Sequence, residues 1–234
     1  MRIYAIIPAR SGSKGYPDKN IKLINDKPLI GYSIDFAKKL NCDKIICSTD
    51  SLEYKKIAES LGAEVPFLRS EYASSDNAME EHILKDLYNN FINYDIELPD
   101  ILVWLRPTFL FRDKEIVLKG LELLVSNENL TAVRTICETE SRLYSLSTDG
   151  KLTPNFEDYG KSMIRRQDVG LKYKVFSTDI FRFNEDNLND SFLGNNIVGL
   201  PIDKICGLDI DDESDFILVK SLIESKCEVV KKYL

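Results

Sequence analysis

The sequence predicts an α/β fold with a Rossmann-like, mostly parallel sheet sandwiched between helices. Three apolar runs of strand length, residues 2–7, 44–48 and 100–105, contain too few polar side chains for one face to meet water. Segments with apolar residues at helical spacing follow these runs along the chain. Buried strands that alternate with helices are typical of a parallel sheet covered on both faces.

The other elements of this pattern follow from periodicity and from end signals. Asp50 and Glu53 predict a capping pair at the start of one helix, and Gly62 ends that helix. Asp212 predicts the N-cap of the last helix, which follows another strand-like segment. The predicted helices cover residues 28–40, 50–61, 76–92 and 113–127, and a further strand covers residues 64–68.

The chain is expected to form one domain, residues 1–234, with a β-rich insertion at approximately residues 138–183. In that stretch, turn signals such as STDGK separate short segments such as RLYSLS and YKVFSTDIFRF. Hairpin-like segments that lie outside a main sheet need another surface to pack against.

Composition and charge exclude several classes of protein. The net charge of -7 argues against a general nucleic-acid binder, which needs a basic surface to contact phosphates. No apolar run approaches the roughly 18 residues of a membrane span, and the N-terminal run is too short for a signal peptide. The five cysteines are scattered and form no CxxC pair, so neither a disulfide framework nor a thiolate zinc site is expected. A reducing cytoplasm is the expected compartment.

The segment IIPARSGSKGYPDKN places a cationic loop directly after the first predicted strand. In an open α/β sheet, ligands bind beyond the carboxyl ends of the strands. Gly12 and Gly15 allow backbone N–H groups to turn around an anion, while Arg10, Lys14 and Lys19 supply positive charge. The spacing differs from that of the P-loop, in which the lysine follows the second glycine. The loop is therefore interpreted as a phosphate-binding loop, with a solvated surface loop as the alternative.

A second candidate feature is the segment GLDIDDESD near the C-terminus. If it ends a strand, alternation places Asp209 and Asp211 on one face and turns Ile210 into the core. Two carboxylates on one side suit Mg²⁺, which prefers oxygen ligands together with phosphate oxygens. The alternative is that these residues only cap a helix and carry solvated charge. The metal hypothesis requires the basic loop and the acidic pair to face each other across one crevice.

The segments IIPARSGSKGYPDKN, KPLIGYSIDFA and STDS resemble the acylneuraminate cytidylyltransferase family, the CMP-sialic acid synthetases and their relatives. The resemblance implies a fold like that of the nucleotide-diphospho-sugar transferases. It implies an enzyme that transfers CMP from CTP to a nonulosonic-acid-like sugar acid and releases pyrophosphate, with Mg²⁺ as cofactor. It also implies a homodimer in which the β-rich insertion is the dimerisation element.

The resemblance assigns roles to individual residues. It implies that the triphosphate and the cytidine are held by Arg10, Ser13, Lys14, Lys19 and Asn20. It further implies that Arg10, Lys19 and Asp211 take part in catalysis. Arg69, in the segment RSEYASSD, either helps to bind the nucleotide or is an ordinary surface arginine.

The chain departs from the family pattern on the acceptor side. Arg106, in LRPTFLFR, replaces a glutamine that contacts substrate or base, so it either adds a cation for a more negatively charged acceptor or pairs with a local carboxylate. Phe176 stands where the family has the asparagine of an Asn-Gly pair that meets the sugar acid, and is expected to form an apolar wall. The segment RRQD resembles one from which an arginine reaches the active site of a partner subunit, which implies substrate-binding roles for Arg165, Arg166 and Gln167.

Two alternatives to a sugar-acid cytidylyltransferase stay open from the sequence. The first is an enzyme of the same class with another anionic acceptor, such as a phosphonate or a polyol phosphate. The second is a non-catalytic nucleotide-binding paralogue, although the intact Asp209 and Asp211 pair argues against it.

Overall fold

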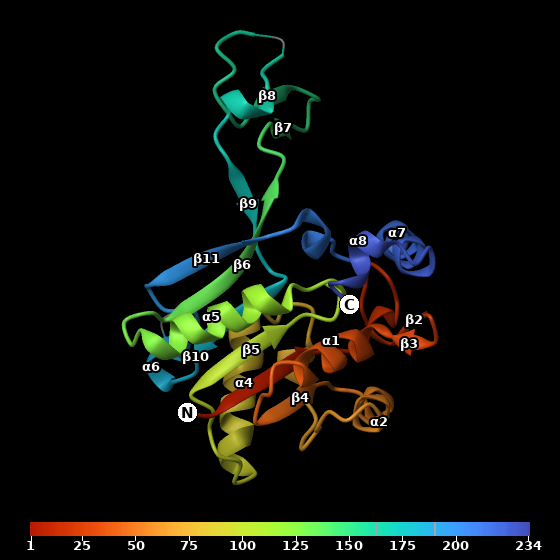
Figure 1. Cartoon of the computed structure of the whole chain (residues 1–234), viewed down its shortest axis with the longest axis vertical. Helices are drawn as coiled ribbons and strands as arrows, with labels where there is room; N and C mark the ends of the chain where they lie inside the picture. Colours follow the sequence, from red (N-terminus) through yellow and green to blue (C-terminus); the bar gives the residue numbers. More distant parts are fainter. Residues whose placement is uncertain (162, 190) are drawn as a thin grey trace.

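A computed structural model of the chain, which describes residues 1–161, 163–189 and 191–234, contains a central seven-stranded sheet (Figure 1). The strand order is β11-β6-β10-β5-β1-β4, with β9 paired to β6. β10 runs antiparallel to both of its neighbours, and β9 runs antiparallel to β6. The predicted α/β class with a mostly parallel sheet is confirmed. The strands are β1 Ile3–Pro8, β4 Lys44–Ser48, β5 Ile101–Leu105, β6 Ala132–Thr139, β9 Lys172–Lys174, β10 Thr178–Arg182 and β11 Ile197–Ile202.

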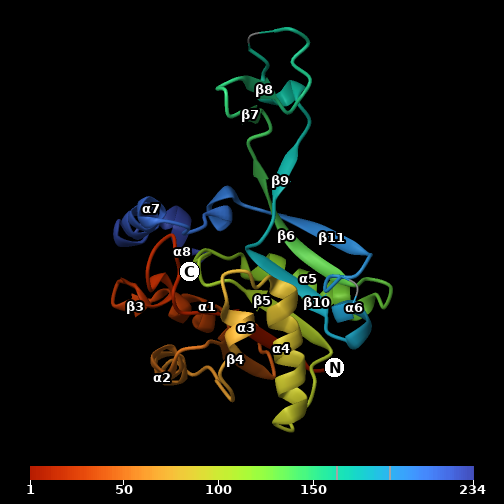
Figure 2. The ribbon, with the colours of Figure 1, turned by 180° about the vertical axis from the view of Figure 1, so that it is seen from behind.

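Helices cover both faces of the sheet and bury two apolar cores against it. On β1, Ala5 and Ile7 face the core under α1, α2 and α5, while Tyr4 and Ile6 face the core under α4 and α6. This alternation follows from the two-residue period of a strand. Figure 2 shows α4 on the side of the sheet opposite to α1 and α5. The helices are α1 Leu29–Lys38, α2 Leu52–Ser60, α3 Glu71–Ser74, α4 Glu80–Asn93, α5 Lys114–Ser126, α6 Glu185–Asn189, α7 Glu213–Glu224 and α8 Glu228–Lys231.

Two predicted helix boundaries are wrong for local reasons. The side chain of Ser51 caps α2 by accepting from the backbone of Glu53 and Tyr54, because Asp50 instead accepts bonds from the backbone and hydroxyl of Ser11. The helix expected over 76–92 begins only at Glu80, after the separate short helix α3. The ends predicted from Gly62, at φ +90°, and from the Asp212 cap are confirmed.

Two strands that the sequence predicts do not form in the described residues. Residues 64–68 form no strand, and only a single bridge joins Glu64 to Ile46 beside β4. Residues 208–211, which carry the acidic pair, follow the 3₁₀ turn η3 Lys204–Gly207 and form no strand. Ile210 is nevertheless fully buried, as the alternation predicted, and its N–H donates to the carbonyl of Thr108.

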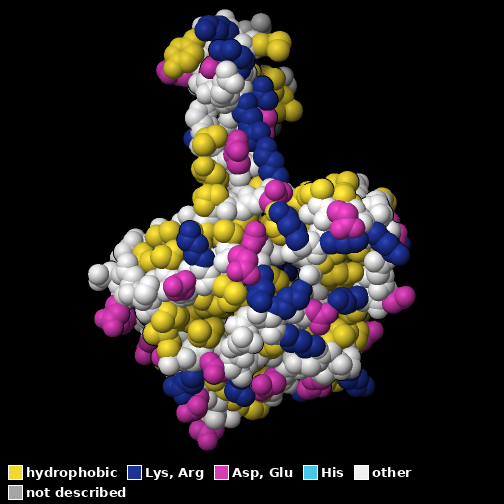
Figure 3. Space-filling model, viewed as in Figure 1, with side chains coloured by type: hydrophobic (Ala, Val, Ile, Leu, Met, Phe, Trp, Pro, Cys, Tyr) yellow, Lys and Arg dark blue, Asp and Glu magenta, His cyan; other side chains and the backbone are white. Residues whose placement is uncertain are grey.

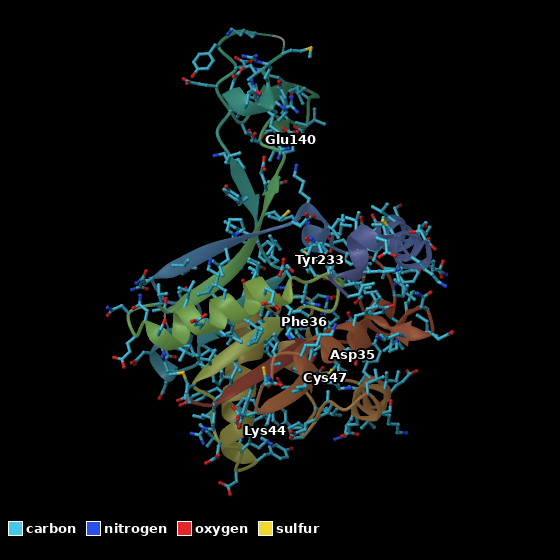
Figure 4. All side chains as sticks on the ribbon, in the orientation of Figure 1. Asp35, Phe36, Lys44, Cys47, Glu140 and Tyr233 are labelled. Carbon is cyan, nitrogen blue, oxygen red and sulfur yellow. The ribbon has the colours of Figure 1, made fainter. Side chains whose placement is uncertain are left out.

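An arm projects from the sheet between β6 and β9 (Figure 1). It carries the hairpin β7 Tyr144–Leu146 and β8 Leu152–Pro154 and the turn η2 Arg166–Asp168. Glu140 lies on this arm, clear of the sheet and its helices (Figure 4). The predicted insertion extends too far, because β10 lies in the main sheet between β5 and β6. The boundary was missed because the buried segment TDIFR has the same strand-like pattern as the arm.

The C-terminal segment completes a third, smaller core. α7 and α8 pack Phe216, Val219 and Val230 against Ile24 and Leu29. Ile24 belongs to the two-stranded ribbon of β2 Leu23–Ile24 and β3 Lys27–Pro28. This packing holds the segment that precedes α7 next to the basic loop. Among the described residues, no helix has the length and apolar character needed to cross a membrane.

Candidate active site

A cleft of about 520 Å³ lies at the carboxyl ends of β1 and β5. Pro8 ends β1 at one side of the cleft, while Trp104 of β5 and the following Thr108 line another. The predicted loop residues Arg10, Ser13, Lys14, Lys19 and Asn20 all line it. Arg69, Arg106 and Asp211 line the same cleft from other parts of the chain. The structure thus brings eight of the predicted site residues together.

The basic loop and the acidic segment are in direct contact. Lys19 donates to the carbonyl of Ile210 at 2.8 Å, and its Nζ lies 3.8 Å from Oδ1 of Asp211. A Cβ on Gly15 would come within 2.7 Å of the carbonyl oxygen of Asp211, so only glycine allows the loop to approach this closely. Lys19 of the basic loop and Asp211 of the acidic pair thus meet across one crevice, as predicted, whereas Asp209 is not among the residues that line it.

Asp76 holds two of the loop cations. Its Oδ1 lies 3.0 Å from Nη1 of Arg10, and its Oδ2 lies 2.7 Å from Nζ of Lys14. Hydrogen bonds from Lys14 and Arg10 lower the pKa of Asp76 below its usual value. Its side chain is 44% exposed. The sequence analysis did not identify Asp76 as a site residue, although it ends the RSEYASSD segment.

Arg69 lies inside the protein at the base of the cleft. It is 5% exposed, and two of its nitrogens donate to the hydroxyl and the carbonyl of Ser48 at 3.0 and 2.7 Å. Burial lowers the pKa of Arg69 to about 10. The alternative of a surface arginine is therefore wrong, and the side chain fixes the end of β4 against the cleft.

The two aspartates of the acidic segment differ in exposure. Oδ1 of Asp209 is buried without a hydrogen-bond partner among the described residues, whereas the Asp211 side chain is 77% exposed. Burial, and then the nearby charge of Asp211, raise the pKa of Asp209, against the opposing effect of a hydrogen bond from Thr108. A buried anionic oxygen without a partner fits a bound cation.

The carboxylate oxygens of Asp209 and Asp211 suit Mg²⁺ better than a metal ion whose ligands all come from protein side chains. No cluster of three or more His, Cys, Asp or Glu side chains occurs in residues 1–161, 163–189 and 191–234. Mg²⁺ is commonly held by one or two carboxylates together with water and substrate phosphates. Asp211 offers one such carboxylate in the cleft next to the cationic loop, and Asp209 offers a second two residues earlier in the chain, outside the cleft lining.

Arg106 pairs with carboxylates of its own chain, the second of the two possibilities raised by the sequence. Its Nε donates to Oε1 of Glu80 at 2.7 Å, and its Nη1 donates to Oδ2 of Asp179 at 3.0 Å. Glu80 also accepts from the indole of Trp104. Sequence reasoning missed Glu80 and Asp179, because nothing in their local pattern marks them as partners of Arg106.

The remaining predicted residues lie outside the cleft lining. Arg165, Arg166 and Gln167 are on the arm, where Arg165 pairs with Asp168 and Arg166 pairs with Glu138. Phe176 lies at the base of the arm, and its carbonyl accepts from Nη1 of Arg106.

A scan against family models matches residues 4–97 to the model described as Cytidylyltransferase. The CMP-N,N'-diacetyllegionaminic acid synthase of Legionella pneumophila is 32% identical over 98% of this chain and 100% of that protein. The N-acylneuraminate cytidylyltransferase of Escherichia coli O18:K1:H7 is 31% identical over 96% of this chain, which spans 53% of that protein. The solved structure of CMP:2-keto-3-deoxy-manno-octonic acid synthetase complexed with CTP has a TM-score of 0.70 at 15% identity, covering 97% of this chain and all of the other.

Proposed function

The chain belongs to the cytidylyltransferase family, and on that premise we propose that it transfers CMP from CTP to a nonulosonic-acid-like sugar acid and releases pyrophosphate. The observation that carries this proposal is the contact between Lys19 of the basic loop and Asp211 of the acidic pair in one cleft. The names of the two relatives, a diacetyllegionaminic acid synthase and an acylneuraminate cytidylyltransferase, support a sugar acid as the acceptor. Because the reaction consumes CTP, we also propose a cytoplasmic location.

The loop residues bind the nucleotide in this proposal. Arg10, Lys14 and Lys19 contact the triphosphate and offset the negative charge that builds on the departing pyrophosphate. Arg10 and Lys14 exchange Asp76 for phosphate oxygens when CTP enters. The acceptor hydroxyl then loses its proton to solvent water, and its oxygen attacks the α-phosphorus in line as the bond to the β-phosphate breaks and its electron pair stays with the departing pyrophosphate.

The other residues proposed for nucleotide binding position the loop or the cytidine. The side chain of Asn20 donates to the carbonyl of Arg10 at 3.1 Å, and this bond holds the loop in shape. We propose that Ser13 and Arg69, which line the same cleft, orient the cytidine. The loop then already has its binding conformation before the nucleotide arrives, so little conformational entropy is lost on binding.

We propose that Asp209 and Asp211 hold Mg²⁺ in the loaded enzyme. The partnerless Oδ1 of Asp209 supports this assignment. The bound ion would neutralise charge on the phosphates and lower the pKa of the acceptor hydroxyl. Lys19 keeps the segment of Asp211 against the loop, so both aspartates stay beside the triphosphate.

A phosphorylated acceptor has less support than a sugar acid. The additional cation at Arg106 motivated that alternative, but Glu80 and Asp179 offset its charge. A phosphonate or polyol phosphate gains no free positive charge at this position. We assign Arg106 instead as a positioning residue that shapes the acceptor side of the cleft.

We propose that the arm pairs with a second copy of the chain. Apolar side chains gather along the arm (Figure 3). The large apolar side chains that the arm exposes are Leu143, Tyr144, Leu146, Leu152, Tyr159, Met163, Leu171 and Tyr173. Pairing would bury them and bring Arg165, Arg166 and Gln167 to the cleft of the partner subunit. Sedimentation should give a dimer for the wild type and a monomer for Leu146→Asp, and a wild-type monomer would contradict the pairing.

Pyrophosphate release tests the reaction directly. The protein is mixed with each of the four ribonucleoside triphosphates, Mg²⁺ and a panel of nonulosonic acids, phosphonates and polyol phosphates. We expect release only with CTP and a sugar acid, and no release after the metal is chelated. Tight CTP binding without release for any acceptor would favour a binding protein, and release with a polyol phosphate alone would assign the other acceptor class.

A further inference from the structure

Two arginines at the acceptor side of the cleft share one buried carboxylate. Asp179 is 0% exposed, and Arg134 binds it through two nitrogens at 2.7 and 3.1 Å. Arg106 adds a third bond to the same carboxylate and also pairs with Glu80. Two guanidinium groups therefore face two carboxylates, and this wall of the cleft has no unbalanced positive charge.

Both arginines lie against the ring of Phe176. The guanidinium carbons of Arg106 and Arg134 are 5.2 and 5.5 Å from the ring centroid, within the range of a cation–π contact. Arg106 also donates to the backbone carbonyl of Phe176. The ring is thus held by two cation–π contacts and by the hydrogen bond to its own backbone carbonyl.

The backbone of Phe176 is strained. Its φ is +94°, while the other described non-glycine residues with positive φ lie between 49° and 58°, in the ordinary left-handed region. A bulky side chain at such an angle persists only where the surroundings impose it. The bond from Arg106, together with the two cation–π contacts, supplies that constraint.

The rest of the chain covers Phe176 only in part. Phe176 is 47% exposed, and it lies beside Arg106, which lines the cleft. A rigid, open aromatic face next to the cleft can contact the acceptor without a further ordering cost. It offers apolar surface where a hydroxyl group would find no hydrogen-bond partner.

We propose that the ring of Phe176 selects sugar acids with an apolar substituent, a deoxy methyl carbon or the methyl of an acetamido group, over acids with hydroxyl groups at those positions. This inference rests on the proposed function. An apolar group that packs against the ring moves from water to a hydrocarbon surface, which is favourable. A hydroxyl group in the same place loses its hydrogen bonds to water and gains none in return. A difference of this kind in one apolar pocket changes kcat/KM by about 10- to 200-fold.

Matched acceptors test the selection. N,N'-Diacetyllegionaminic acid and pseudaminic acid carry a second acetamido group and a terminal methyl where N-acetylneuraminic acid carries hydroxyls. We expect the wild type to prefer the better of the two apolar acids by about 10-fold or more in kcat/KM. Phe176→Asn should reduce this preference by about 10-fold through the KM for the acceptor, with the KM for CTP unchanged.

Two further variants separate selection from folding. Phe176→Gly suits a positive φ and keeps the backbone bond to Arg106, so it folds if Phe176→Asn does not, and it should also lose the preference. Tyr94→Asn removes another exposed aromatic side chain, at the far end of α4, and should leave the preference as it is.

The outcomes distinguish this inference from the proposed function. Release of pyrophosphate with a preference that neither Phe176 variant changes would overturn the inference and leave the proposed function standing. A wild type that prefers N-acetylneuraminic acid would overturn it too. Absence of release with CTP and any sugar acid would overturn both.

Discussion

Arg10 and Lys14 in the basic loop are neutralised by one aspartate, and Arg106 of the cleft and the neighbouring Arg134 by another, but the two aspartates differ in burial. Asp76 is 44% exposed and holds its cations from a loop after α3. Asp179 is fully buried within β10 of the central sheet. When the Asp76 carboxylate moves away from Arg10 and Lys14, water can take its place. Nothing can take the place of the buried Asp179 carboxylate beside Arg106 and Arg134.

This difference separates cations that are available to a ligand from cations that build the scaffold. An exposed ion pair contributes little to stability, so a triphosphate can displace its acid at small cost. A buried pair resists separation, because each partner would be left as an uncompensated charge. Residue type alone therefore does not identify a ligand-binding arginine, since the burial of its partner decides the role.

The largest expected effect comes from breaking the buried side. Asp179→Asn should lower the free energy of unfolding by about 3–5 kcal/mol, because two arginines lose their common carboxylate. Urea denaturation measures the change. Asp76→Asn is the matched control, and it should leave the urea midpoint nearly unchanged. Equal destabilisation by the two variants would remove the distinction between the two ends of the cleft.

The next effect concerns the acidic segment that meets the basic loop. Asp211→Asn should reduce turnover by about 10²- to 10³-fold, as expected for a group that stabilises developing charge, and its exposed side chain should leave the melting temperature unchanged. Asp212→Ala at the next position removes the cap of α7, so it should cost about 1 kcal/mol of stability and keep turnover within a few-fold. Pyrophosphate release at the wild-type rate from Asp211→Asn would refute the metal assignment.

A smaller effect is expected for the exposed cations. Arg10→Ala should weaken CTP binding by about 10- to 100-fold, the loss of one or two hydrogen bonds to charged groups. Isothermal titration calorimetry measures the affinity. Arg2→Ala, which breaks an exposed ion pair with Glu97 outside the cleft, should bind CTP as the wild type does. Unchanged CTP affinity in Arg10→Ala would exclude this arginine from the nucleotide site.

The smallest effect is a gain. Asp76→Asn should raise the affinity for CTP about two- to five-fold at low salt, because Arg10 and Lys14 no longer have a competing carboxylate. The gain should shrink as salt is added. A loss of affinity would instead show that Asp76 supports the loop in the bound state.

The same variant has a pH signature. The lowered pKa of Asp76 means that its ion pairs stabilise the wild type at neutral pH, and that this contribution is lost as pH falls through the lowered pKa. The small difference in melting temperature between the wild type and Asp76→Asn should therefore be constant from pH 7 to 5 and disappear only in stronger acid.

The sequence was sufficient to predict the meeting of loop and acidic pair. Short-range signals placed the loop at the end of a buried strand, and the rule that ligands bind at the carboxyl edge placed it beside a cleft. Lys19 and Asp211, which are in contact, each lie in a segment that the sequence itself marks as a candidate site motif. Burial of Ile210 likewise followed from alternation, although the segment is not a strand.

The partners of the arginines could not be predicted in the same way. Arg10 meets Asp76 across 66 residues, and Arg106 meets Asp179 across 73. The second contact exists because β10 enters the sheet antiparallel between β5 and β6, and no periodic pattern in the sequence encodes that position. The burial of Arg69 could not be predicted for the same reason, because it depends on contacts with another segment of the chain.

The connection from β9, at the base of the arm, to β10 is only three residues long. β9 ends at Lys174 and β10 begins at Thr178, with Phe176 in the middle of the connection. So short a tether has no slack, and a tilt of the arm is transmitted along it to the ring and to the strand behind it. If a second copy of the chain holds the tip of the arm, as proposed, the same three residues connect that contact to the ring proposed to select the acceptor.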